Sequence, residues 1–328
     1  MNTVSISPNT RTERTPRTER ALGVLFALVS GIAMAAQGRV NGQLGAELHD
    51  SMLAAVISFG GGLLLLLLAL PFSTTMRRGI GNVRAAVRSR TLQPWHCLGG
   101  VGGATFVASQ SITVTALGIA LFTVGVVGGQ TISGLFVDRA GLGPAGGQPL
   151  TWPRVLGALL TLAAVAFSLS GGLGDNGAAL WMLVLPLVAG ALLAVQQAIN
   201  GRVKSVADSA LTATLVNFAV GTAVLVLGWL VSLVLRGGPV GFPSNPVLYL
   251  GGVVGIVFIA LASFVVKWTG VLLLGLSAIA GQLIGSVLLD LLLPAAGRHL
   301  SGQTLVGTAI ALVAIVIAAW PTGGQRDA

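Results

Sequence analysis

The sequence predicts an all-α integral membrane protein in which ten transmembrane helices form two inverted five-helix repeats. The first supporting observation is composition: 54% of the 328 residues are hydrophobic and 8% are charged, whereas soluble domains carry about a quarter charged residues. The second is a series of ten apolar segments, each long enough to cross a bilayer. The third is that sequence blocks of the first half recur in the second half, in the same order.

The ten spans follow from length, because a helix crossing about 30 Å of hydrocarbon needs roughly 20 mostly apolar residues. The spans expected in the first half are 21–39, 52–72, 95–115, 118–137 and 154–172. Those expected in the second half are 179–198, 211–235, 247–266, 269–289 and 303–320. The resulting domains are a disordered cytoplasmic tail (1–20), two repeats (21–173 and 174–321) and a second cytoplasmic tail (322–328). A cleavable signal peptide is disfavoured, because the first apolar run has no obvious cleavage end.

Three ungapped blocks indicate that the two halves are copies. GIAMAAQGRVNG (31–42) aligns with GALLAVQQAING (190–201), LGGVGGATF (98–106) with LGGVVGIVF (250–258), and GGQTISGLFVD (128–138) with AGQLIGSVLLD (280–290). The alignment pairs polar residues at Gln37–Gln196, Asn41–Asn200, Gln130–Gln282 and Asp138–Asp290, and it pairs Phe59 with Phe218. Since five spans is an odd number, the second copy must enter the membrane from the opposite face.

The basic residues select one orientation. With the N-terminus inside, fifteen of the 18 basic residues fall in cytoplasmic segments: Arg11, Arg14, Arg17, Arg20, Arg77, Arg78, Arg84, Arg88, Arg90, Arg139, Arg154, Arg202, Lys204, Lys267 and Arg326. Only Arg39, Arg236 and Arg298 fall outside. The positive-inside rule therefore predicts that both termini are cytoplasmic. Within the longest cytoplasmic connection, 73–94, Arg84 and Arg88 lie one helical turn apart beside an apolar stripe. Two interpretations stay open there: a helix on the anionic membrane surface, or a solvated basic loop.

Composition and motifs disfavour several other functions. The net charge of +9 is not accompanied by zinc-ligand or helix-turn-helix patterns, so no nucleic-acid partner is expected. Cys97 is the single cysteine, which leaves no internal disulfide and no cysteine-based metal cluster. No nucleotide-binding GxxxxGK[ST] motif is present, and no nucleophile and base are grouped within the spans. We therefore expect no enzyme activity, no catalytic residue, no metal and no cofactor.

The blocks Q-x3-N-G, SMLAAVISF (51–59) and GQTISGLFVD together resemble the drug/metabolite transporter (DMT) superfamily, and within it the YdcZ-type inner-membrane exporters. That family's usual member resembles one five-helix unit, whereas this chain resembles two such units fused over about residues 21–320. The second copy departs from the first, with Asn217 in place of Ser58 and with LLLP after Asp290 in place of RAGL. The resemblance implies an EamA-like ten-helix bundle in the cytoplasmic membrane and small-molecule export, without naming a substrate.

Inverted repeats commonly build alternating access around a site near the membrane midplane. The leading hypothesis is therefore a secondary transporter, with a small-molecule substrate and the lipid bilayer as partners and a homodimer left open. A flippase for lipids or lipid-linked headgroups, and a non-transporting membrane subunit, are the alternatives. Substrate identity, direction and coupling ion are not readable from the sequence.

Intramembrane polar residues are costly, so each is a candidate for the substrate path. Gln130 and Gln282 fall nearest the midplane, where an amide that both donates and accepts suits an uncharged or zwitterionic metabolite; their alternative role is to join helices. Gln110 and Asn217 are further lining candidates.

Helix length places Gln37 near the outer surface and Gln196 near the inner surface. Each is followed by an Asn-Gly pair, at Asn41 and Asn200, that suits a helix C-terminus. Two interpretations stay open: capped helix ends, or polar gates at opposite mouths of one pathway.

Asp138 and Asp290 are the two acidic candidates. Both are predicted near helix ends, at opposite faces, where a carboxylate can stay hydrated. An interfacial anchor is the favoured role and ion coupling the alternative.

Overall fold

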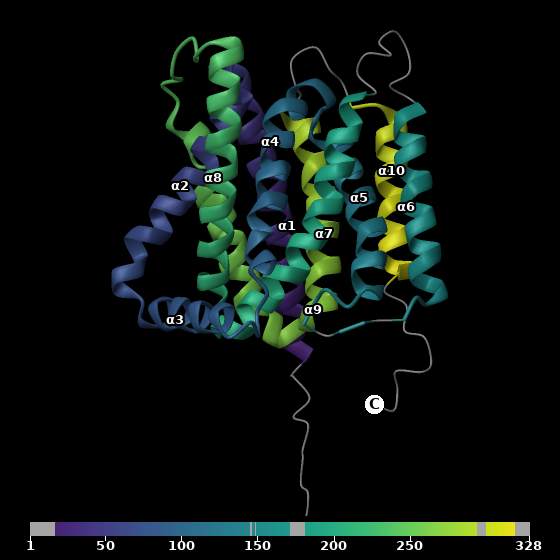
Figure 1. Ribbon diagram of the computed structural model, residues 1–328. Coiled ribbons are helices and arrows are strands. Elements are labelled where there is room, and N and C mark those ends of the chain that lie inside the picture. Colours follow the sequence, from purple (N-terminus) through teal and green to yellow (C-terminus); the bar gives the residue numbers. More distant parts are fainter. Residues whose placement is uncertain (1–16, 145, 148, 171–180, 294–299, 319–328) are drawn as a thin grey trace, which may run out of the picture.

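The computed structural model describes residues 17–144, 146–147, 149–170, 181–293 and 300–318, in which every regular element is helical (Figure 1). The first-half helices are α1 (Arg17–Leu48), α2 (Ser51–Ala69), α3 (Thr74–Arg88), α4 (Gly100–Leu117), α5 (Ile119–Arg139) and α6 (Trp152–Ser170). The second-half helices are α7 (Val184–Ala207), α8 (Ala210–Arg236), α9 (Gly251–Leu292) and α10 (Gly302–Ala318). Short 3-10 turns, η1 (Leu70–Phe72), η2 (Pro94–Gly99) and η4 (Pro246–Tyr249), precede α3, α4 and α9.

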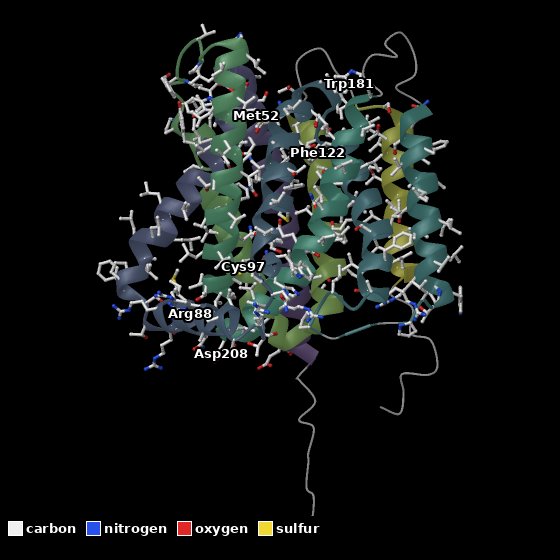
Figure 2. The ribbon with its side chains drawn as sticks, viewed as in Figure 1. Met52, Arg88, Cys97, Phe122, Trp181 and Asp208 are labelled. Carbon is white, nitrogen blue, oxygen red and sulfur yellow. The ribbon has the colours of Figure 1, made fainter. Side chains whose placement is uncertain are left out.

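The helices stand side by side, except α3, which lies across one end of the bundle (Figure 1). We call that end the foot and the opposite end the head. Arg88 and Asp208 lie at the foot, and Met52 and Trp181 lie at the head (Figure 2). Seven helical stretches of the described residues are long and apolar enough to cross a membrane: Ala21–Leu48, Ser51–Phe72, Pro94–Leu117, Ile119–Arg139, Trp181–Ala207, Ala210–Leu235 and Gly275–Leu292. Trp152–Ser168 and Gly302–Ile317 are apolar but shorter.

The first helix of each repeat is longer than predicted. α1 already begins at Arg17, within the predicted tail, and both α1 and α7 continue several residues past their Asn-Gly pairs. The chain leaves α1 through His49 and α7 through Asp208, which adopt left-handed φ angles of 54° and 50°. Asp50 and Ser209 then accept hydrogen bonds from the first turns of α2 and α8. The prediction that the Asn-Gly pairs end helices is therefore wrong, because the residues that make the left-handed turn lie eight positions further along.

α9 joins two predicted spans in one helical run, and its two ends contact α1 in opposite directions. The contacts, in chain order along α9, are Gly251–Asn41, Gly255–Gln37, Gly281–Leu28 and Gly285–Ile32. A straight helix would separate Gly255 from Gly281 by about 39 Å, whereas their partners on α1 are about 14 Å apart. The run therefore folds back on itself, so that its first part is antiparallel to α1 and its last part is parallel to it.

The two repeats pack against each other through their helices. α9 of the second repeat packs on α1 of the first, and α4 and α5 of the first repeat pack on α7 of the second. Glycines permit this close packing. An added Cβ at Gly31 would collide with the backbone of Ala278, and at the equivalent Gly190 it would collide with the backbone of Val126. The reciprocal contacts obey the same equivalence: Gly281 lies against Leu28, and Gly129 lies against Leu187. Small residues at helix contacts are the usual device in lipid, where apolar burial between helices contributes little.

Two equivalent phenylalanines meet at the centre of the molecule. The rings of Phe59 (α2) and Phe218 (α8) stack with their centroids 4.8 Å apart and their planes at 24°. A contact between equivalent residues lies on the axis that relates the repeats. α1 ends just before Met52 at the head, whereas α7 ends just before Asp208 at the foot (Figure 2). Equivalent helices therefore point in opposite directions.

Candidate functional site

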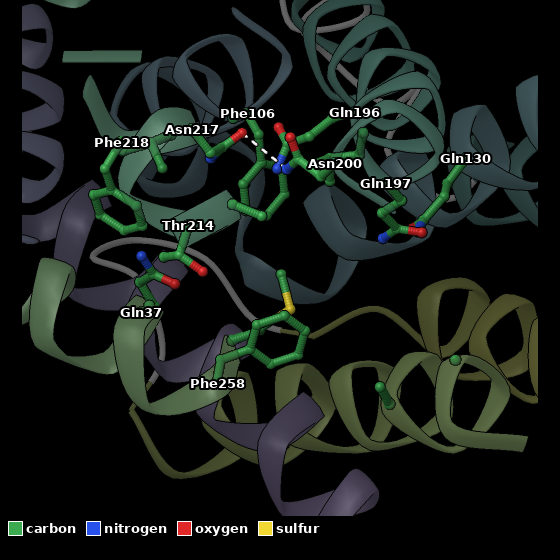
Figure 3. Close-up of a pocket in the computed structure, with 18 of the residues that line it drawn as sticks. Gln37, Phe106, Gln130, Gln196, Gln197, Asn200, Thr214, Asn217, Phe218 and Phe258 are labelled. Atoms are coloured by element: carbon green, nitrogen blue, oxygen red, sulfur yellow. Dashed lines mark hydrogen bonds between the residues drawn. The ribbon is translucent and has the colours of Figure 1, made fainter. Parts of the chain in front are cut away.

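A cavity of about 390 Å³ lies between the repeats. It is bordered by α1, α2, α4, α5, α7, α8 and α9, so both halves of the chain contribute to it (Figure 3). Its polar lining side chains are Gln37, Gln130, Gln196, Gln197, Asn200, Lys204, Thr214, Asn217 and Gln282. Its aromatic lining side chains are Phe59, Phe106, Phe218 and Phe258.

The cavity extends from the centre of the bundle towards the foot. The stacked rings of Phe59 and Phe218 border its central part. Lys204 and Ala210, on either side of the turn between α7 and α8, border its other end. That turn lies at the foot, as the position of Asp208 shows (Figure 2). The Lys204 side chain is exposed, so the cavity reaches the end of the bundle that carries α3.

Six of the eight amide residues predicted for a substrate path line this one cavity. They are Gln37, Gln130, Gln196, Asn200, Asn217 and Gln282. The prediction that Gln37 and Gln196 lie at opposite surfaces is wrong, because α1 and α7 extend well beyond them and bring both side chains to the centre. The Gln196 Oε1 atom is buried without a hydrogen-bond partner among the described residues.

The other two predicted residues close the head side. Asn41 Nδ2 donates to Gln110 Oε1 at 2.9 Å, and both side chains are fully buried. Gly42 packs against Val114 beside them, so α1 and α4 meet without a gap. Asn41 Oδ1 and Gln110 Nε2 have no partner among the described residues.

Equivalent asparagines thus have different partners at the two ends. On the foot side, Asn200 Nδ2 donates to Asn217 Oδ1 at 3.0 Å, and both residues line the cavity (Figure 3). Asn41 bonds to Gln110 of α4, whose equivalent in the second copy is Ala262 and offers no amide. Asn41 and Ser58, the equivalent of Asn217, both lie against Gly251, as Asn200 and Asn217 lie against Gly99. The two sides differ in packing as well, because Gly42 of α1 packs against Val114 of α4, whereas the equivalent Gly201 of α7 lines the cavity.

Neither acidic candidate lines the cavity. Asp290 accepts hydrogen bonds from the backbone N–H groups of Ile119 at 3.1 Å and Ala120 at 2.8 Å, which caps the start of α5. The side chain is buried, so the prediction of a hydrated carboxylate is wrong at this position; the N-terminus of α5, rather than water, supplies its donors. Asp138, half exposed, pairs with Arg154 at 3.1 Å at the foot.

Sequence reasoning missed Gln197, Thr214, Lys204 and the aromatic lining. Gln197 stands beside Gln196 in the repeated block AVQQAING, and Thr214 is a polar residue inside an apolar span, so both carried a signal. The four phenylalanines carried only the signal of their equivalence, Phe59 with Phe218 and Phe106 with Phe258, because an apolar side chain in a membrane span faces lipid as readily as a cavity. Among the described residues, no group of three or more His, Cys, Asp or Glu side chains is placed to hold a metal ion.

A search of curated proteins found no match. Six chains of solved structures match. One of them, described as "Crystal structure of protein", is 22% identical over 92% of this chain and 97% of its own, with a TM-score of 0.49. The sequence model of one family matches twice, over residues 22–167 and 181–317. The chain therefore belongs to the DMT family described as "Putative inner membrane exporter, YdcZ", with two family units fused in one polypeptide.

Proposed function

We propose that the protein is a secondary transporter that exports small molecules across the cytoplasmic membrane by alternating access. The observation that carries the proposal is the cavity shared by the two repeats, lined at equivalent positions by Gln37 and Gln196 and by Gln130 and Gln282. In the proposed topology, the ten crossings are the seven candidate spans, the two shorter apolar helices and the first part of α9. Because α1 and α7 point in opposite directions, these crossings form two inverted units, the arrangement from which alternating access is commonly built.

The lining favours an amphipathic substrate without net positive charge. Amides donate and accept hydrogen bonds but offer no negative charge to a cation. The four phenyl rings offer apolar and aromatic contact. A volume of about 390 Å³ lies within the range of pockets that bind drug-sized molecules. We infer that uncharged or zwitterionic metabolites of this size are carried.

The foot is the cytoplasmic end in this proposal. Helix α3, which carries Arg77, Arg78, Arg84 and Arg88, lies there (Figure 1), and basic residues favour the cytoplasmic side. The cavity, which reaches the foot, therefore loads from the cytoplasm. Release requires the opposite state, in which the contact of α1 with α4 at Gly42 opens and the cavity beside Gly201 closes.

The test begins with metabolite profiles, inside and outside, of cells that overexpress or lack the protein. A compound that changes is then measured in proteoliposomes with Gln130→Leu and Gln282→Leu. Both changes remove lining donors and acceptors, so transport should fall by at least about tenfold, because a site built to hydrogen-bond its substrate loses heavily without the bond. Gln93→Leu, in the exposed connection before α4, is the matched control.

Unchanged transport by both lining variants, at normal membrane abundance, would remove the cavity from the proposal. A labelled phospholipid in the same proteoliposomes separates the alternative function. Lipid scrambling without metabolite movement would identify a flippase instead.

A further inference from the structure

α3 is an amphipathic helix whose basic side is not used by the protein itself. Met76, Gly79 and Val83 are buried against the bundle. At about 100° per residue, Arg77, Arg84 and Arg88 lie within about 40° of one another, on a flank about 130° from the centre of that buried side. We call these three residues the arginine stripe, and all three are exposed. The ion pair recorded among the described residues joins Arg154 and Asp138, so no described carboxylate neutralises the stripe.

Exposed aromatic side chains stand at both ends of α3. Phe72, just before the helix, is 90% exposed, and Trp95, after it, is 43% exposed. A phenyl ring so open to water would be unfavourable, whereas aromatic rings beside basic residues are typical of the boundary between lipid and headgroups. The helix lies across the foot rather than along the bundle (Figure 1). The position of α3 at the foot of the bundle and its positive charge are thus those expected of a helix that contacts an anionic lipid surface.

The apolar side of α3 packs on the rim of the cavity. An added Cβ at Gly79 would collide with Thr212, whose hydroxyl donates to the backbone oxygen of Met76 at 3.3 Å. Val83 packs in a cluster with Val203 and Ala207. The same turn between α7 and α8 carries the lining residues of the cavity mouth. An interaction that fixes the position of α3 therefore also fixes the turn between α7 and α8 at the mouth of the cavity.

We propose that the arginine stripe binds the headgroups of anionic phospholipids and that this binding holds the cavity mouth open at the foot. The second repeat has no equivalent of the arginine stripe: after Arg236 at the end of α8, the connection 237–245 contains no basic residue and no α-helix. The lipid site thus acts on one side of the membrane only. Binding itself does not depend on the transport function, whereas the effect on the cavity rests on it.

Lipid binding is tested on the purified full-length protein by native mass spectrometry with added phosphatidylglycerol. The triple variant Arg77→Gln/Arg84→Gln/Arg88→Gln should bind phosphatidylglycerol about fivefold more weakly for each arginine removed. The matched Lys triple variant, which keeps the charge, should retain most of the binding. Arg139→Gln, an exposed arginine at the end of α5, is the control for charge loss elsewhere. Inorganic phosphate should not displace the lipid. Equal binding by wild type and the Gln triple variant would overturn the lipid site.

The effect on the cavity is tested with Asn200→Cys in a Cys97→Ser background, reconstituted in phosphatidylcholine with or without phosphatidylglycerol. A water-soluble maleimide should label this cysteine severalfold faster when phosphatidylglycerol is present. The Gln triple variant should label at one rate in both membranes. Lipid binding without any change in labelling would overturn the coupling to the rim. Because neither readout requires transport, failure here is distinguishable from failure of the proposed function.

Discussion

Equivalent asparagines in this protein take different partners, because the second copy has Asn217 where the first has Ser58 and Ala262 where the first has Gln110. Asn41 is buried against Gln110, whereas Asn200 borders a cavity and bonds to Asn217. The head contact leaves Asn41 Oδ1 and Gln110 Nε2 buried and unpaired among the described residues. Buried polar atoms without partners are costly, by about 1–3 kcal/mol each. The head is therefore closed by a contact that is only partly satisfied, which suits a gate that must open.

The head contact predicts a recoverable loss of stability. Gln110→Leu leaves the buried Asn41 amide without its hydrogen-bond partner, so the free energy of unfolding should fall by about 1–3 kcal/mol. Replacing both partners, Asn41→Leu with Gln110→Leu, should restore most of it, because no stranded amide remains. Thermal unfolding of the purified single and double variants in detergent measures the effect. A double variant as unstable as the sum of the single variants would show that the two amides do not act as a pair.

Helix pairs are held by glycines that bring backbones together. Gly31 of α1 faces α9, and Gly190 of α7 faces α5, at equivalent positions. At each contact, an added Cβ would collide with a neighbouring backbone oxygen, which cannot move as a side chain can. Both copies keep a glycine at this position because α1 with α9 and α7 with α5 are equivalent helix pairs with the same close packing.

Gly31→Ala and Gly190→Ala should each destabilise the protein, because the methyl group forces two backbones apart. Each substitution should lower the free energy of unfolding by about 2 kcal/mol or more, a size typical of overpacking. Gly61→Ala is the matched control, since an added Cβ there meets nothing within 4 Å and alanine favours a helix. Thermal unfolding measures all three. If Gly61→Ala were as harmful as the other two, helix contact would not be the reason.

The whole molecule combines near-equivalent halves with unequal conformations. The contacts of α1 with α9 reproduce those of α7 with α5, so the halves share one construction. The cavity, however, reaches only the foot, while α1 and α4 close the head. The cavity is therefore open at the end where α7 and α8 meet and packed at the end where α1 and α4 meet.

This asymmetry predicts sided accessibility. In the Cys97→Ser background, Asn200→Cys should react with an impermeant maleimide applied from the cytoplasmic side, because the residue borders the open cavity. The equivalent Asn41→Cys, fully buried, should react at least about tenfold more slowly from either side in this conformation, as expected where reagent access is excluded. Inside-out and right-side-out vesicles provide the measurement. Reaction of Asn200→Cys from the external side would reverse the orientation of the molecule.

The sequence by itself determined the membrane class, the duplication and the pairing of equivalent residues, because apolar length and repeated blocks are local properties. It also placed most of the cavity amides, since a polar residue inside a span needs a polar neighbour or a ligand. It misjudged where α1 and α7 end, because Asn41-Gly42 resembles a helix end as closely as His49 does.

Only the tertiary structure decided that Gln37 and Gln196 share one cavity, that Asn41 meets Gln110, and that Asp290 caps α5. These contacts join residues from different helices and, for Gln37 with Gln196 and for Asp290 with α5, from different repeats. The spacing of residues along one helix determines which side chains lie on the same face. Which residues of other helices that face contacts is determined by the packing of glycine-lined helices across the two repeats.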